Sequence, residues 1–121
     1  RFPTLSMPLG IPSPAAVELM GTDMIPAKAL VSSNGSVGLR FNEAVGFGLD
    51  FMVIKDPRKA GGLEGEGTLS WGGAAGTWFW VDPTNDVVFI GMIQRFGGTG
   101  GPDLGTATRT LVYQALVDPA K

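Results

Sequence analysis

The residues that could do chemistry in this chain are few, because the sequence contains neither cysteine nor histidine. The absence of cysteine excludes disulfides, thiolate metal sites and a cysteine nucleophile. The absence of histidine removes the usual general base at neutral pH and the commonest metal ligand. A Ser-His-Asp catalytic arrangement therefore cannot be assembled from these residues.

The most informative segment is residues 68–81, which are strand-like on both sides of a glycine-rich centre. Glycine inside a strand indicates that something approaches the backbone closely, because bulkier residues would pack better there. Trp71, Gly72 and Gly73 are therefore the candidate binding residues. The alternative for Trp71 is a core aromatic. Trp78 and Trp80 are expected to be core residues, because they lie in a strand that is apolar on both faces.

Three other groups of residues invite a functional interpretation. The run 97–101 reads Gly-Gly-Thr-Gly-Gly, but it lacks the Gly-Lys-Ser/Thr ending of a phosphate-binding loop, so we expect a flexible loop. Glu64 and Glu66 lie two apart in a charged segment, and without histidine they predict a solvated surface rather than a metal site. Asp82 and Asp86 flank a turn and are expected to serve it. The sequence implies no metal and no organic cofactor.

The elements that must position these residues follow from local signals. Ser13 before Pro14 reads as an N-cap followed by proline at the first helical position, and Asp103 can cap the last helix. The turn at 82–86 should join 78–81 and 87–90 into an antiparallel hairpin. In chain order we predict an irregular arm over 1–12, a helix over 14–20, a strand over 47–54, a charged loop over 55–66, one strand or two joined by a bend over 68–81, a strand over 87–94 and a helix from 103 to about 117.

The last helix and the hairpin predict where the core lies. The apolar residues of the helix fall on one stripe, and Arg109 falls off it. These residues are Leu104, Ala107, Leu111, Val112, Ala115 and Leu116. Trp78 and Trp80 should point to one face of the sheet, and Phe79 and Val81 to the other. The last helix can cover one apolar face, but the first helix is too short to cover the other. We therefore expect another chain, or a missing N-terminal segment, to pack on the sheet.

Length and composition describe at most one globular domain, with 121 residues of which 44% are hydrophobic. The formal charge is -2 and the two signs are interspersed, which gives no indication of a nucleic-acid or membrane surface. No apolar run approaches the roughly 18 residues that a transmembrane helix needs. Nothing in the sequence assigns a compartment.

Three short motifs, with the strand and helix that follow them, carry a family resemblance. The motifs are Gly46-Phe47-Gly48-Leu49, then residues 71–76, then Trp78-Phe79-Trp80-Val81-Asp82-Pro83. In this order they resemble the C-terminal part of the serine β-lactamase-like superfamily. That superfamily includes class C β-lactamases, penicillin-binding proteins and β-lactamase-fold (family VIII) carboxylesterases, and the Trp-Gly-Gly triplet is most similar to the esterases.

The resemblance implies an α+β fold in which an antiparallel sheet is flanked by helices, with a long C-terminal helix. Residues 13–121 would be the C-terminal part of such a domain, and residues 1–12 would be an arm outside it. The implied activity is that of a serine hydrolase that acts through an acyl-serine intermediate. The family's nucleophile lies in a Ser-x-x-Lys motif, and a tyrosine assists proton transfer; both lie upstream of the part that this chain resembles.

The serines of this chain do not supply that nucleophile. None has lysine three residues later, a test applied to Ser6, Ser13, Ser32, Ser33, Ser36 and Ser70. The sole tyrosine, Tyr113, lies in the last predicted helix and is followed by Gln114, which departs from the family's tyrosine motif. The chain is therefore expected to supply a wall of the site, with the nucleophile outside it.

The family's third motif, Lys/His-Thr/Ser-Gly, corresponds here to Trp71-Gly72-Gly73. The resemblance implies that the next residue, Ala74, donates its backbone N–H to an oxyanion hole. Trp71 and Gly72 have neither the charge nor the hydroxyl that binds a penicillin carboxylate, which favours an uncharged acyl substrate such as a short ester. The alternatives are a non-catalytic processed fragment or oligomeric binding module, and a β-lactamase or penicillin-binding relative acting on an amide.

Overall fold

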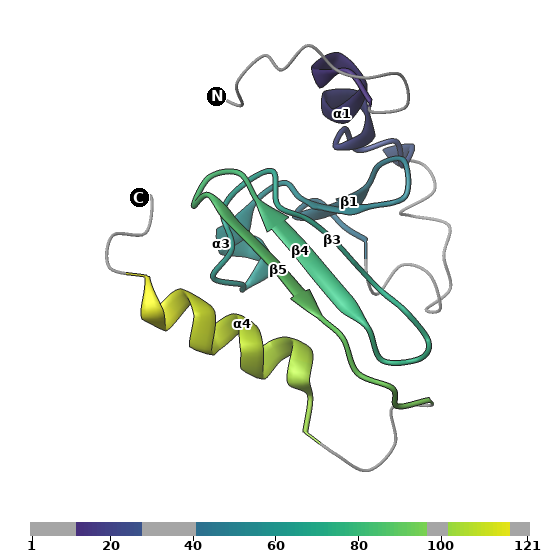
Figure 1. Ribbon diagram of the computed structural model, residues 1–121. Helices are drawn as coiled ribbons and strands as arrows, with labels where there is room; N and C mark the ends of the chain where they lie inside the picture. The colour runs from purple at the N-terminus through teal and green to yellow at the C-terminus, as the bar shows by residue number, and fades with distance from the viewer. Residues whose placement is uncertain (1–11, 28–40, 97–101, 117–121) are drawn as a thin grey trace.

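The computed structural model describes residues 12–27, 41–96 and 102–116, which form an antiparallel sheet with helices beside it (Figure 1). The strands are β1 (Val45–Phe47), β2 (Met52–Ile54), β3 (Leu69–Gly72), β4 (Trp78–Asp82) and β5 (Val87–Gly91). They pair in chain order, and each neighbouring pair is antiparallel. The helices are α1 (Pro14–Met20), α3 (Pro57–Ala60) and α4 (Leu104–Ala115). This architecture confirms the predicted α+β class with a C-terminal helix.

The ends of α1 and α4 follow the predicted caps. The Ser13 side chain accepts a hydrogen bond from the Ala16 N–H at 3.2 Å, and Gly21 ends α1. The Asp103 carboxylate accepts from the Thr106 N–H at 3.2 Å, so it caps α4 as predicted. α4 ends at Ala115, slightly before the predicted end near 117. The predicted arm falls, apart from residue 12, outside the described residues, as does the loop 97–101.

The predicted single strand over 47–54 is wrong, because this segment folds back on itself. β1 and β2 form a hairpin in which the Gly48 N–H donates to the Phe51 carbonyl at 2.8 Å. Asp50 adopts a positive φ of 70°, which ends the extended backbone. A Cβ at Gly48 would overlap the carbonyl oxygen of Met20, so the turn fits only because this position is glycine. Close packing against Met20 at the end of α1 and Thr22 after it therefore sets the turn, and the apolar pattern of the segment does not predict this contact.

The segment 68–81 forms two strands joined at the glycines, which was one of the two predicted possibilities. β3 and β4 pair from Leu69 opposite Val81 to Gly72 opposite Trp78. The predicted hairpin of 78–81 with 87–90 is also confirmed, since β4 pairs with β5 along its whole length. β5 ends at Gly91, before the predicted end at 94. The charged loop over 55–66 contains the unpredicted short helix α3, which the Asp56 side chain caps.

One face of the sheet carries the core and packs against α4. The indole of Trp80 is fully buried and stacks on Phe89, with ring centroids 4.2 Å apart. Tyr113 of α4 lies 6.5 Å from the Trp80 ring, and the Arg109 guanidinium lies 5.4 Å from it. The predicted apolar stripe of α4 is therefore wrong in its orientation, because Arg109 faces the sheet while Leu111 is 65% exposed.

The other face is covered near β1 and left open near β5. The segment after α1 is hydrogen-bonded to the edge of β1, where the Met24 N–H donates to the Phe47 carbonyl at 2.9 Å, and its Asp23 side chain lies over Gly46 on this face. On β5 of the same face Val88 is 67% exposed and Ile90 is 66% exposed. No described residue packs over them enough to bury them. Among the described residues, no helix is long and apolar enough to cross a membrane.

Candidate functional site

The turn between β3 and β4 presents the glycine-rich segment at one end of the sheet. The Gly73 N–H donates to the Thr77 carbonyl at 2.7 Å, and the Gly76 N–H donates to the Gly73 carbonyl at 3.0 Å. Gly76 has a φ of +88°, a conformation that glycine adopts without the strain of a Cβ. The result is a tight three-residue loop in which Ala74 occupies the second position of a β-turn.

Ala74 offers an unused backbone donor at this turn. The residue is exposed, and its N–H donates to no acceptor among the described residues. Its neighbours are occupied, because the Gly73 N–H is bound to Thr77 and the Ala75 carbonyl accepts from the Arg95 N–H at 2.9 Å. An exposed donor held by a rigid turn can bind an anionic or carbonyl oxygen without reorganising.

The edge of β3 is open beside this donor. β2 pairs with β3 only through Met52 opposite Ser70 and Val53 opposite Leu69. Within the part of the chain that the structure describes, Trp71 and Gly72 are therefore paired to β4 alone. A Cβ built on Gly72 would meet only the Thr77 carbonyl, at 3.6 Å, so no side chain blocks the backbone here. An extended ligand could lie along this edge, as ligands do in strand addition.

Trp71 forms an aromatic wall at the open edge. It is 41% exposed, so the structure favours a surface-lining position over a core position. Its ring makes an edge-on contact with Phe47, with ring centroids 5.0 Å apart. Phe47 contacts Phe41 in turn, at 5.5 Å. Such packing fixes the Trp71 ring and leaves part of its surface available to an apolar group.

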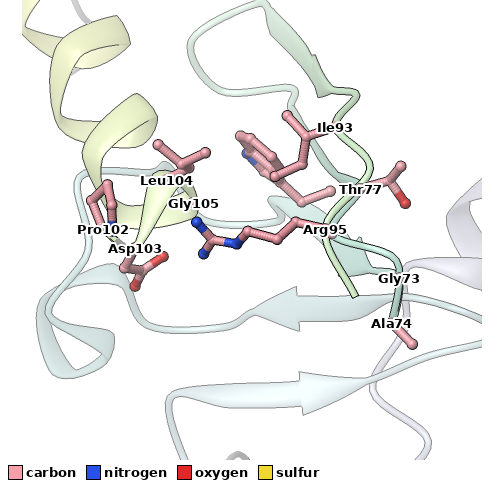
Figure 2. A pocket seen from close by; sticks show the side chains of 11 residues that line it. Gly73, Ala74, Thr77, Ile93, Arg95, Pro102, Asp103, Leu104 and Gly105 are labelled. Atoms are coloured by element: carbon pink, nitrogen blue, oxygen red, sulfur yellow. The ribbon is translucent and has the colours of Figure 1, made fainter. Parts of the chain in front are cut away.

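A cavity of about 370 Å³ lies against the same turn, between it and the first turn of α4 (Figure 2). Of the sequence-predicted site residues, Gly73 and Ala74 line it, whereas Trp71 and Gly72 do not. The other lining residues are Gly76, Thr77, Trp78, Ile93, Arg95, Pro102, Asp103, Leu104 and Gly105. The structure thus brings together the open edge of β3 and a cavity that share two residues. Arg95 was missed by the sequence reasoning, since a lone arginine after a strand carries no signal.

The opposite end of β4 holds a closed polar network centred on Asp82, which is 1% exposed. Its carboxylate accepts hydrogen bonds from the Tyr113 hydroxyl at 2.6 Å and from the Gly65 N–H at 2.8 Å. It also accepts from the backbone and side chain of Asn85 and from the Thr84 N–H. The prediction that Asp82 serves its turn is confirmed, and the carboxylate also ties α4 to the sheet. We call these residues the Asp82 network.

The Asp82 network shifts the acidities of both ionisable groups within it. Burial alone raises the pKa of the Asp82 carboxyl, but the hydrogen bonds from Gly65, Tyr113 and Asn85 outweigh it and hold that pKa below its usual range. Burial, followed by the hydrogen bond to Asp82, raises the pKa of the Tyr113 hydroxyl well above its usual value. Tyr113 is therefore a neutral structural donor, far in the fold from Ala74.

The expectation that Glu64 and Glu66 both lie on a solvated surface is wrong for Glu64. Glu64 is 7% exposed rather than solvated, and its Oε1 lies 2.8 Å from the Arg109 Nε. The N–H does not point at the oxygen, so the contact is an ion pair and not a hydrogen bond. Glu66 is exposed, as predicted. The described residues contain no cluster of acidic side chains suited to hold a metal ion.

Comparison with known proteins gives a match to a part of longer polypeptides. No protein-family model matches the chain. Protein Rv1367c of Mycobacterium tuberculosis (strain H37Rv) is 39% identical over 86 residues, which are 69% of this chain and 21% of the relative. Protein MT1414 of Mycobacterium tuberculosis (strain CDC 1551) shows the same identity over the same lengths. The chain thus spans about a fifth of the length of the curated relatives it matches.

Proposed function

We propose that this chain is the C-terminal portion of a β-lactamase-fold serine hydrolase, closest to the carboxylesterases of that superfamily. The observation that carries the proposal is the exposed, unused N–H of Ala74, held by a tight turn beside the open edge of β3. The motif resemblance assigns the oxyanion role to this residue, and its geometry suits that role. The nucleophilic serine, its lysine and the tyrosine would lie outside this chain.

The mechanism that this proposal entails uses Ala74 at one step. A serine attacks the ester carbonyl, and the negative charge that develops on its oxygen is stabilised by the Ala74 N–H. As the carbonyl re-forms, the alcohol leaves with the proton that the serine gave up, and water then hydrolyses the acyl-serine to the acid and restores the serine hydroxyl. One donor of this kind contributes about 3 kcal/mol to transition-state stability, or 10²–10³ in kcat. Ala74 contributes no proton transfer, because it offers only a backbone amide.

The substrate preference follows from Trp71 and Gly72. The wall of Trp71 and Phe47 suits an apolar acyl or alcohol group, and neither Trp71 nor Gly72 carries a charge for a carboxylate at this edge. We therefore propose a short, uncharged acyl group on this side of the turn. A β-lactamase or penicillin-binding activity is the less favoured member of the same class, and turnover of nitrocefin by the complete protein would favour it.

The test removes the Ala74 donor without disturbing the turn. Proline is favoured at the second position of a β-turn, so Ala74→Pro deletes the N–H where the backbone tolerates it. In the complete product of the gene that encodes this chain, Ala74→Pro should lower kcat for p-nitrophenyl butyrate by about 10²–10³. The matched control, Ala74→Gly, keeps the N–H and should stay within a few-fold of wild type.

Three results would contradict the proposal. Wild-type kcat in Ala74→Pro would remove the oxyanion role. Ester hydrolysis by the isolated chain would show that the nucleophile lies within it. If the complete product of the gene has no Ser-x-x-Lys motif upstream of this segment, the protein is not a serine hydrolase of this superfamily.

A second candidate, a non-catalytic oligomeric binding module, is favoured by one observation. Val88 and Ile90 expose their side chains on β5, an edge strand without lysine or proline to discourage pairing. In this case another chain would cover the sheet. Light scattering should then show an oligomer of the purified chain, and Ile90→Lys should return it to a monomer. A monomeric wild-type chain would exclude this candidate.

A further inference from the structure

The cavity beside the β3–β4 turn contains a cation, Arg95, that has no counter-charge among the described residues. Figure 2 shows the Arg95 side chain extending across the cavity towards the residues that begin α4. Arg95 is partly buried, and none of the ion pairs among the described residues includes it. Of the 11 acidic residues in the chain, all but Asp118 lie in the described ranges. The guanidinium therefore lacks a carboxylate partner from the described part of the chain.

Asp103, the one carboxylate among the described residues that line the cavity, is already engaged. Asp103 accepts from the Thr106 N–H at 3.2 Å and from the Thr106 hydroxyl at 2.7 Å, so both of its oxygens serve the start of α4. It does not come within ion-pair distance of Arg95. The contrast with Arg109 is informative, because that arginine has Glu64 at 2.8 Å and stacks over Trp80. Partly buried arginines usually find such partners, since burying an unpaired charge is costly.

The remaining walls indicate the rest of the ligand. Ile93, Leu104 and the Trp78 ring give the cavity apolar surface, and Gly105 places no side chain into it. A volume of about 370 Å³ is within the range of small-molecule sites. The guanidinium fork matches a carboxylate in geometry and charge. Because the Asp103 carboxylate also lines the cavity, it would repel a dianion such as phosphate more strongly than a monocarboxylate.

We propose that this cavity binds a small monocarboxylate with a short apolar tail, anchored by Arg95. The carboxylate pairs with the guanidinium, and the tail lies against Ile93 and Leu104. The site is separate from the open edge of β3, although Gly73 and Ala74 border both. This binding does not depend on ester hydrolysis, so it stands or falls apart from the proposed function.

The experiment titrates the purified chain with butyrate and follows backbone amide signals by NMR at constant ionic strength. The amides of Gly73, Gly76 and Gly105, which line the cavity, should shift in a saturable way. The Gly65 amide, which is bound to Asp82 at the other end of the sheet, should not. Butyramide, which has the same size without the charge, should bind at least about tenfold more weakly.

Substitutions assign the binding to Arg95. Arg95→Gln should weaken butyrate binding at least about tenfold, and Arg95→Lys should retain part of it, because lysine keeps the charge but loses the fork. The control is Arg58→Gln, which removes an exposed arginine of α3 away from the cavity and should leave binding unchanged. Equal binding of butyramide, unchanged binding in Arg95→Gln, or no saturable shift would each overturn the proposal. Tighter binding of inorganic phosphate would overturn the carboxylate assignment.

Discussion

The two ends of β4 hold polar groups in opposite ways. At its C-terminal end the Asp82 carboxylate accepts five hydrogen bonds from described residues, and Tyr113, Gly65 and Asn85 are all used. At its N-terminal end, no described residue accepts from the Ala74 N–H or pairs with the Arg95 guanidinium. At one end the polar groups are hydrogen-bonded to one another, and at the other a backbone donor and a cation are available to a ligand.

The difference separates stability from function. A buried polar group that is fully satisfied rigidifies the structure, whereas removing one partner leaves the others unpaired at high cost. The open Ala74 N–H costs little, because it is exposed to water, whereas the partly buried Arg95 gains a counter-charge when an anionic ligand arrives. Changes at the Asp82 network should therefore lower the free energy of unfolding, and changes at the turn should mainly alter binding.

The largest expected effect comes from Asp82→Asn. The amide keeps the shape but loses the charge, and its NH₂ group faces donors such as the Tyr113 hydroxyl. We expect the free energy of unfolding to fall by about 3 kcal/mol, because several hydrogen bonds to a buried charge are lost together. Urea unfolding followed by circular dichroism measures it.

The matched control for this prediction is Asp86→Asn. Asp86 is exposed in the same turn at a φ of 55°, a conformation that asparagine tolerates well. Its stability should change by no more than about 0.5 kcal/mol. Equal losses in the two variants would refute the idea that the network, rather than the turn, carries the stability.

The next effect concerns Tyr113 and alkaline pH. Its hydroxyl has a pKa above the value of about 10 that it takes in the unfolded chain, so the folded state holds its proton longer. The stabilisation is fully present below pH 10 and is lost as the pH rises beyond it. Because Tyr113 is the only tyrosine, absorbance at 295 nm should rise together with unfolding and not before it.

Tyr113→Phe sharpens this test. At neutral pH the free energy of unfolding of the variant should be about 2 kcal/mol lower, because one hydrogen bond to a charged group is lost. Its stability should then fall less steeply above pH 10 than that of the wild type. A tyrosinate signal with a midpoint near pH 10 in the folded protein would show that the contact with Asp82 does not hold in solution.

The parts of the fold that the sequence predicted are those with local causes. Ser13 and Asp103 cap their helices with their own side chains, and the residue types at 82–86 are themselves typical of a turn. Gly48 and Asp50 were misjudged because their turn depends on Met20, which lies far away in the sequence. The face of α4 was misjudged for the same reason, since Glu64 brings Arg109 onto the sheet.

The candidate site divides in the same way. Trp71, Gly72 and Gly73 could be selected because glycine in a strand is unusual wherever it occurs. Whether the Ala74 N–H is free depends on the exact conformation of the turn, which the residue types do not specify. Arg95 lies in the cavity because the chain after β5 is tied back to the turn through the Ala75 carbonyl. No pattern of residue types encodes that contact.

The smallest of these effects, but the most direct test of the open end, is Gly76→Ala. At a φ of +88° a Cβ is strained, and it would also approach the Arg95 carbonyl at 3.0 Å and the Ile93 side chain at 3.1 Å. We expect the free energy of unfolding, measured by thermal unfolding, to fall by about 1.5 kcal/mol. Amide NMR signals of 73–77 and 95 should move while that of Gly65 stays in place. A shift at Gly65 of similar size would mean that the two ends of β4 are coupled, and that stability and binding cannot be assigned to separate ends.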